Sequence, residues 1–264
     1  RRGTFSERGP GPCGAGLCPG DPDIHPGVGA VRRLELSPRL RTVADLVPEG
    51  ARLADVGTDH AYLPAALILE GRIPFAIAAD LRQGPLDRAR ATVREYGLTG
   101  KAAFRLCDGL RGIRPDEVDA IAIAGMGGET IAAILEAAPW TRERDVPLIL
   151  QPMSSMPDLR SWLGENGCQI VEERLVREGD TLYTVLSVRA GEMKPMTLAE
   201  LWAGRNSGAP LRGAWLDQWI ARTQRALAGM AQAQGEGVPA RRQMLEEVCG
   251  GLIEMKKEWE QWRR

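Results

Sequence analysis

The sequence lacks three features that would assign it at once to a broad class of protein. It has no apolar run of the roughly 20 residues that a membrane-spanning helix needs, so no transmembrane segment is predicted. Its formal net charge is -1, so no general excess of positive charge indicates a nucleic-acid binder. The five cysteines are scattered and odd in number, which argues against a disulfide framework and favours reduced thiols.

Large apolar side chains are almost missing from the first 30 residues, which are rich in Gly and Pro. Such a segment cannot bury enough surface to offset the entropy lost on ordering, so we expect residues 1–33 to form a disordered tail. Cys13, Cys18 and His25 lie there, but their spacing matches no common zinc pattern and we predict no metal site. The tail also lacks the apolar core of a signal peptide, which favours a cytoplasmic protein.

Short apolar strands alternate with helix-like segments from residue 34 onward. Strands are expected at 52–56, 75–79, 102–106, 118–124 and 147–151, and helices at 37–47, 61–70, 84–96, 128–137 and 155–166. This alternation predicts βαβ units and a parallel sheet. Two further strands, 170–176 and 182–189, have no room between them for a crossover helix and must form an antiparallel hairpin. An α/β, Rossmann-like sheet of this kind over residues 34–190 resembles the class I methyltransferase fold.

Residues 195–264 are predicted to form a separate helical domain. Two apolar stripes step by three and four residues and are separated by the helix-breaking segment 235–239, which predicts an antiparallel coiled-coil hairpin. Glycines 250 and 251 in the second helix indicate a close crossing or a kink. The stripe residues expected in the core are Leu216, Ile220, Thr223, Leu227 and Met230, then Leu245, Val248, Leu252, Met255, Trp259 and Trp262.

Four loops at the ends of the predicted strands carry residue types that suit an adenosyl cofactor, since ligands of open α/β sheets bind beyond the carboxyl ends of strands. The first loop holds Asp55, Gly57, Thr58 and Asp59. Gly57 permits a tight turn, whereas Asp59 stands where a dinucleotide-binding motif has its second glycine. Carboxylates there repel a pyrophosphate and suit the ammonium of a methionine moiety. S-adenosylmethionine is therefore favoured over NAD, although the acids could simply cap a helix.

The other three loops complete the predicted cofactor site. They contain Asp80 and Leu81, then Asp108 and Gly109, then Ala124, Gly125 and Met126. Asp80 is placed to accept hydrogen bonds from the ribose hydroxyls, and Asp108 to accept one from the exocyclic amine of adenine. The glycines of the last loop open space at the reacting methyl group, and the helix that follows offers free amides. Four such loops in order predict the cofactor far better than any one of them.

With these residues laid out, the chain resembles the bacterial tRNA adenine-N1 methyltransferases that act on the adenine at tRNA position 22. The resemblance covers residues 34–190, and the helical pair matches the family in architecture. Thr58 stands where family members often have Ser, and Asp80 where they often have Glu. The segments that carry the resemblance are Leu36–Leu40, Ala54–Pro64, Ala122–Gly128, Leu148–Pro152 and the hairpin turn 177–180.

The resemblance implies a displacement reaction in which orientation supplies most of the acceleration, because adenine N1 already carries a lone pair. The product is cationic, so a carboxylate near N1 or N6 would stabilise the developing charge. Asp59 is the candidate for this catalytic role. His60 is a second candidate, although it can equally pack and cap the start of a helix. Met126 and residues 151–152 are expected to form the wall and the polar edge of the adenine pocket.

The tRNA partner also implies contacts to its backbone, because N1 lies inside a Watson–Crick pair and the base must be unpaired or extruded. Arg39 and Arg41 precede the first strand and are the predicted RNA-binding residues. Other basic residues, which either contact phosphate or are simply solvated, are Arg32, Arg33, Arg160, Arg241, Arg242, Lys256 and Lys257.

Three alternatives stay open at this point. The chain could methylate another RNA or a small molecule with the same cofactor. An oxidoreductase with a nicotinamide or flavin would need a glycine-rich pyrophosphate turn, which Asp59 interrupts. A non-catalytic RNA-binding or assembly protein centred on the coiled coil would not require acids at three strand ends.

Overall fold

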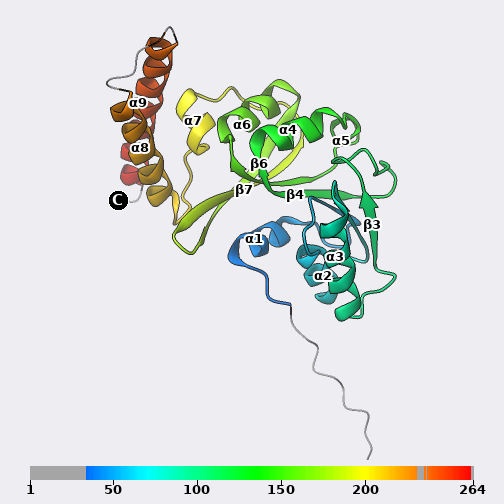
Figure 1. Ribbon diagram of the computed structural model, residues 1–264. Coiled ribbons are helices and arrows are strands. Elements are labelled where there is room, and N and C mark those ends of the chain that lie inside the picture. Colours follow the sequence, from blue (N-terminus) through cyan, green and yellow to red (C-terminus); the bar gives the residue numbers. More distant parts are fainter. Residues whose placement is uncertain (1–33, 231–234, 236, 263–264) are drawn as a thin grey trace, which may run out of the picture. The chain divides into compact units, whose positions relative to one another are not determined.

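The computed structural model describes residues 34–230, 235 and 237–262 (Figure 1). The predicted disordered tail, with Cys13, Cys18 and His25, lies outside the described residues. In chain order the elements are α1 (Pro38–Leu46), β1 (Leu53–Val56), α2 (Tyr62–Leu69), β2 (Ala76–Asp80), α3 (Gln83–Glu95), β3 (Ala102–Leu106), β4 (Ala120–Gly127), α4 (Gly128–Glu136), α5 (Trp140–Glu143), β5 (Leu148–Ser154), α6 (Met156–Glu165), β6 (Cys168–Glu178), β7 (Thr181–Ala190), α7 (Leu198–Ala203), α8 (Arg212–Gly229) and α9 (Val238–Trp262).

The predicted strands and helices of residues 34–190 are confirmed, with bounds that shift by a few residues. Helix α5 was not predicted because four residues are too few to show a helical period. The terminal hairpin is longer than predicted, so that only Gly179 and Asp180 remain between β6 and β7. Gly179 has a φ of 57°, the left-handed conformation that a tight turn needs and that glycine adopts without strain.

The described strands form one sheet in the order β3-β2-β1-β4-β5-β7-β6. Strands β1 to β5 are parallel, and β7 pairs antiparallel with both β5 and β6. This confirms the predicted Rossmann-like sheet with an antiparallel end. Successive strands are added toward one edge of the sheet from β1 to β3 and toward the other edge from β4 onward. The boundary between β1 and β4 is therefore a topological switch point, where a crevice beyond the strand ends binds ligands.

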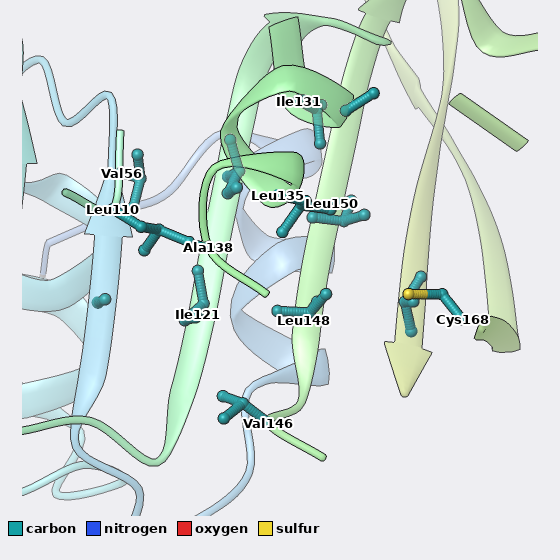
Figure 2. Packing of buried hydrophobic residues seen from close by; sticks show 14 of the residues in the cluster. Val56, Leu110, Ile121, Ile131, Leu135, Ala138, Val146, Leu148, Leu150 and Cys168 are labelled. Atoms are coloured by element: carbon teal, nitrogen blue, oxygen red, sulfur yellow. The ribbon is translucent and has the colours of Figure 1, made fainter. Parts of the chain in front are cut away.

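Both faces of the sheet are covered by helices, which is why its central strands are apolar throughout. On one face, Val56, Ile121 and Leu150 pack with Ile131 and Leu135 of α4 (Figure 2). Alternate residues of the same strands point to the opposite face, where the cluster includes residues of α1, α2 and α3. Helices therefore fix the sheet from both sides, and its carboxyl ends are left for binding.

Helices α7, α8 and α9 build a third apolar cluster, which also contains Met156 of α6 and Leu182 of β7. The two long helices are antiparallel, because Trp259 near the end of α9 packs on Gly213 in the first turn of α8. Trp262 was predicted as a core residue, and this is wrong. It lies one turn beyond the start of α8 and is 63% exposed. Coiled-coil packing and a domain boundary at 190–195 stay predictions.

Of the close crossing or kink predicted at the paired glycines of α9, the crossing is seen at Gly251, whereas Gly250 has no neighbour within 4 Å of an added Cβ. A Cβ on Gly251 would lie 2.7 Å from Cβ of Ala199 in α7. Helix α7 is also held by Arg160 of α6, which is fully buried and donates from Nη1 to the carbonyls of Leu201 and Trp202. Arg160 is therefore not a phosphate contact, contrary to the sequence-based suggestion. Within the described part of the chain, no helix has the length and apolarity to cross a membrane.

Candidate active site

The carboxyl ends of β1 to β4 surround a cavity of about 340 Å³. The structure thus brings the four predicted cofactor loops together, although they are spread over some 70 residues of sequence. The predicted cofactor residues that line this cavity are Gly57, Asp80, Leu81, Asp108, Gly109 and Met126. We call it the strand-end cavity.

Asp55 is a buried carboxylate beneath this edge of the sheet, with 7% of its surface exposed. Burial raises the pKa of Asp55 to about 6; the Thr58 hydroxyl, which hydrogen-bonds the carboxylate, opposes this rise, and the nearby Asp80 charge adds to it. The Thr58 hydroxyl also accepts a hydrogen bond from the backbone N–H of Ala61 at 3.2 Å. Asp55 has no ion-pair partner among the described residues, so a cationic ligand would relieve its desolvation.

Gly57 is the point where the loops after β1 and β4 touch. Its φ of 78° is left-handed, and an added Cβ would fall on Cε of Met126. Only glycine satisfies both conditions, and the left-handed backbone is the tight turn predicted at Gly57. The β4 end is irregular here, with register shifts around Met126 in its pairing with β5. Such bulges re-aim the backbone beside functional sites.

The two acids on the following loops differ in exposure. The Asp80 side chain is 10% exposed, and its Oδ1 accepts a hydrogen bond from the backbone N–H of Arg82 at 2.8 Å. The Asp108 side chain is 59% exposed and lies 3.4 Å from Nη1 of Arg111. Asp80 is thus fixed at the inner end of the cavity, whereas Asp108 lies at its rim.

A second cavity, of about 390 Å³, adjoins the first through Gly57, which lines both. Its walls come from α1, from the loop between β1 and α2, and from the end of β4. The predicted site residues that line it are Arg39, Asp55, Gly57, Thr58, Asp59, His60, Ala124 and Gly125. We call it the acceptor cavity because both candidate catalytic residues lie there.

Asp59 and His60 lie side by side at the mouth of the acceptor cavity. Nε and Nη2 of Arg88 in α3 both donate to Oδ1 of Asp59, and this bonding lowers the pKa of Asp59. His60 lies with Nε2 3.6 Å from Oδ2 of Asp59 and stacks on the Tyr62 ring at 5.0 Å. Arg88 was not predicted, since nothing in the spacing of residues 59 and 88 reveals that they meet.

Gln151 does not form the polar edge of a pocket as expected, because it is fully buried. Its Oε1 accepts hydrogen bonds from Nη1 of Arg39 at 2.6 Å and from the backbone N–H of Gly125 at 3.1 Å. Its Nε2 donates to the Pro152 carbonyl at 2.9 Å. Gln151 therefore joins α1 to the loop after β4 and holds the wall of the acceptor cavity.

Neither predicted RNA-binding arginine is a free surface cation. Arg39 is bonded to Gln151, lies 3.7 Å from Oε1 of Glu178, and places its guanidinium 5.6 Å from the centre of the Tyr183 ring. Arg41 forms a bidentate ion pair with Glu70 on the surface, with N–O distances of 3.0 and 2.6 Å.

The basic residues of α9 that were suggested for phosphate contact mostly have partners of their own. Lys256 pairs with Asp217 and Lys257 pairs with Glu254. The Arg242 side chain donates to the Met230 carbonyl. Arg241 is exposed and has no ion pair within the described residues, so its charge is available to a ligand.

Comparison with known proteins adds to this geometry. A family model described as a methyltransferase domain matches residues 36–186. The tRNA (adenine(22)-N(1))-methyltransferase of Bacillus subtilis is 41% identical over 162 residues, which are 61% of this chain and 68% of the relative.

Two solved structures contain the cofactor or its product. A Streptococcus pneumoniae protein in complex with S-adenosyl-L-methionine is 35% identical with a TM-score of 0.73, covering 84% of this chain and 100% of that one. M. capricolum TrmK with S-adenosyl-homocysteine is 26% identical with a TM-score of 0.68, covering 85% and 98%.

The parallel sheet with its antiparallel end, the acidic strand ends and the matched model together define a methyltransferase domain of Rossmann-like fold. The chain belongs to the tRNA (adenine(22)-N(1))-methyltransferase family.

Proposed function

We propose that this chain is an enzyme that transfers a methyl group from S-adenosylmethionine to N1 of the adenine at position 22 of a tRNA. The observation that carries the proposal is the pair of cavities that meet at Gly57, one with acidic strand ends and one with the candidate catalytic pair. A transfer between two substrates requires adjoining sites that orient them toward each other. The activity named for the Bacillus subtilis relative supports the choice of acceptor.

The residues of the strand-end cavity fit the cofactor by the chemistry of their side chains. When bound, S-adenosylmethionine supplies a methyl group on a positively charged sulfur. Asp80 would accept hydrogen bonds from the ribose hydroxyls and Asp108 from the adenine amine. Buried Asp55, which lines the adjoining acceptor cavity beside Gly57, would gain a cationic partner in the ammonium group. The other proposed cofactor contacts are Gly57, Thr58, Asp59, Leu81, Gly109, Ala124, Gly125 and Met126.

In the acceptor cavity the protein has to bind adenine and stabilise positive charge. Because N1 holds a lone pair, no base is required to generate the nucleophile, and orientation accounts for most of the acceleration. An aspartate is ionised at neutral pH, and Arg88 lowers the pKa of Asp59 further, so a carboxylate is available to the cationic product. His60 and Tyr62, stacked on each other, offer an aromatic surface beside the base.

The RNA must deliver an unpaired or extruded adenine, and Arg39 and Arg41 are the proposed contacts to its backbone. Arg39 lies in the cavity wall and would meet the nucleotide that enters. Arg41 is exposed, and a phosphate there would compete with Glu70. Since a tRNA is the substrate, we place the activity in the cytoplasm.

Two measurements test the proposal. Calorimetric titrations with S-adenosylmethionine, S-adenosylhomocysteine and NAD should show binding of the first two only. Incubation with isotopically labelled S-adenosylmethionine and a tRNA transcript should transfer label to the RNA, and a transcript with guanine at position 22 should receive none. Label on both transcripts would favour another RNA position, and binding of NAD alone would favour the oxidoreductase alternative.

A further inference from the structure

A third cavity, of about 450 Å³, lies where the end of β5 and the start of β7 face α7, α8 and α9. It shares no lining residue with the strand-end and acceptor cavities. Its walls are largely aromatic and apolar, and we call it the tryptophan groove. The large side chains that line it include Met153, Tyr183, Trp202, Trp215, Trp219 and Leu245.

Trp219 is the central aromatic residue of this groove. Its ring meets those of Trp202 and Trp215 edge to face, with centroids 5.3 and 5.6 Å apart, and is held rigidly by them. The Arg222 guanidinium lies 5.2 Å from the ring centre. Nε1 of Trp219 is buried and has no hydrogen-bond acceptor within the described residues. A buried indole N–H without an acceptor is costly, so Trp219 departs from the usual pairing of buried polar groups.

Positive charge lies at the rim of the groove. Arg222 of α8 and Arg241 of α9 line it, both are exposed, and neither forms an ion pair within the described residues. Asp158 is the carboxylate that lines it, and it can accept a hydrogen bond from an amine or a hydroxyl group. The groove thus combines an apolar wall, on which Tyr183 and Trp202 are partly exposed, with two cations that form no ion pair within the described residues.

The groove is linked to the acceptor cavity through shared contacts. Tyr183 lines the groove, and its ring lies under the guanidinium of Arg39, which lines the acceptor cavity. Pro152 of the groove directly follows Gln151, which bonds Arg39 and Gly125. The groove and the acceptor cavity are therefore neighbours on either side of the contact between Arg39 and Tyr183.

From these observations we infer that the tryptophan groove binds a second, unpaired nucleotide of the RNA substrate, close in sequence to the target adenine. The base lies against the half-buried rings of Tyr183 and Trp202, and its phosphate binds Arg222 and Arg241. Aromatic walls beside arginines are how proteins bind single-stranded RNA, since every base has a face that can stack. This inference rests on the proposed function, because it takes the substrate to be RNA.

The test compares two double variants in the full-length protein. Arg222→Gln with Arg241→Gln removes the two groove cations, and Arg225→Gln with Lys257→Gln removes two charges from the same helices outside the groove. All four residues are exposed, so both variants should fold. We expect the groove variant to bind tRNA at least about fivefold more weakly and, because one phosphate is released, to show a logarithmic salt slope smaller by roughly 0.7 to 0.9. The control variant should match the wild type, and S-adenosylmethionine affinity should be unchanged in both.

Ultraviolet crosslinking of the wild-type protein to tRNA, followed by peptide mass spectrometry, adds an independent readout. We expect a nucleotide attached to the α7 peptide that contains Trp202 or to the β7 peptide that contains Tyr183. If the wild type methylates tRNA but the groove variant keeps its affinity and salt slope, the inference is wrong and the groove serves another partner, such as a peptide. If the wild type transfers no methyl group to any tRNA, the proposed function itself fails.

Discussion

Arg39 and Gly125, 86 positions apart, are bonded to the same atom, Oε1 of the fully buried Gln151. The shared acceptor ties α1 to the loop after β4, so that two walls of the acceptor cavity are positioned by one amide. Because the Gln151 amide is excluded from water, a water molecule cannot replace any of its hydrogen bonds that is lost.

Replacing Gln151 should therefore disturb both stability and catalysis. Gln151→Met keeps the length of the side chain but leaves the Gly125 N–H without an acceptor, and we expect a loss of about 1–3 kcal/mol of unfolding free energy. Turnover should fall with little change in S-adenosylmethionine affinity. Urea denaturation and steady-state kinetics measure the two effects. Gln151→Glu, which keeps an acceptor for Arg39, is the control and should retain more turnover; equal losses would argue against a positioning role.

Asp55 should make the stability of the free enzyme depend on pH. Its folded pKa, about 6, lies above the ordinary 3.8, so the folded state binds more protons between these values and stability falls as pH rises through this window. Asp55→Asn should remove a penalty on the order of 2–3 kcal/mol at pH 7 and melt at a higher temperature than the wild type. Near pH 4 the two proteins should differ little. A wild-type protein that is more stable than the variant at pH 7 would contradict this assignment.

The same carboxylate should make cofactor binding depend on pH in the opposite sense. An ammonium group is attracted to ionised Asp55, so S-adenosylmethionine affinity should rise from pH 5 to pH 7 and then level off. Calorimetry across this range checks it. Asp55→Ala should abolish binding while the protein stays folded, and unchanged affinity for S-adenosylhomocysteine in that variant would remove Asp55 from the site.

Gly57→Ala should weaken cofactor binding because the backbone is left-handed and the new methyl group would meet Met126. We expect the dissociation constant for S-adenosylmethionine to rise by about tenfold or more, from strain of roughly 1–2 kcal/mol together with the displaced side chain. Gly57→Ala with Met126→Ala removes the clash but not the strained φ, and should recover only part of the affinity. Full recovery would show that the backbone conformation matters little.

Asp59→Asn tests the proposed catalytic carboxylate. Turnover should fall roughly 10- to 100-fold because an amide cannot stabilise the cationic product, and the change in S-adenosylmethionine affinity should be smaller. The matched control is Asp87→Asn, an acid of the neighbouring helix α3 that pairs with Arg90 and lines neither cavity. A variant at position 59 with normal turnover would leave His60 as the remaining candidate.

The strands, helices and hairpin turn could be predicted from the sequence, whereas the side-chain contacts between residues distant in sequence could not. Buried strands, helices and the short hairpin turn leave local patterns, so the acids at residues 55, 80 and 108 could be placed at one edge of the sheet. The partners of Asp59 and Arg39 could not be found, because Arg88 and Gln151 are distant in sequence and meet only through the packing of α3 and β5.

The basic residues show the same limit. Charge alone suggests Arg41 and Arg160 as phosphate contacts, yet Arg41 pairs with Glu70 and Arg160 is buried beneath α7. The sequence does not reveal whether the side chain of a basic residue is paired with a carboxylate or hydrogen-bonded to a backbone carbonyl. Arg222, by contrast, was not singled out, and only the cavity shows that it stands beside Trp219.

The most direct test of the account is the position of the methyl group in the product. The purified chain would be incubated with S-adenosylmethionine and a tRNA transcript, and the RNA digested and mapped by fragment mass spectrometry. The account predicts one added methyl group, on N1 of the adenine at position 22, and none when Asp55 is replaced by Ala. A methyl group at another position, on another atom, or absent in the presence of bound cofactor would contradict it.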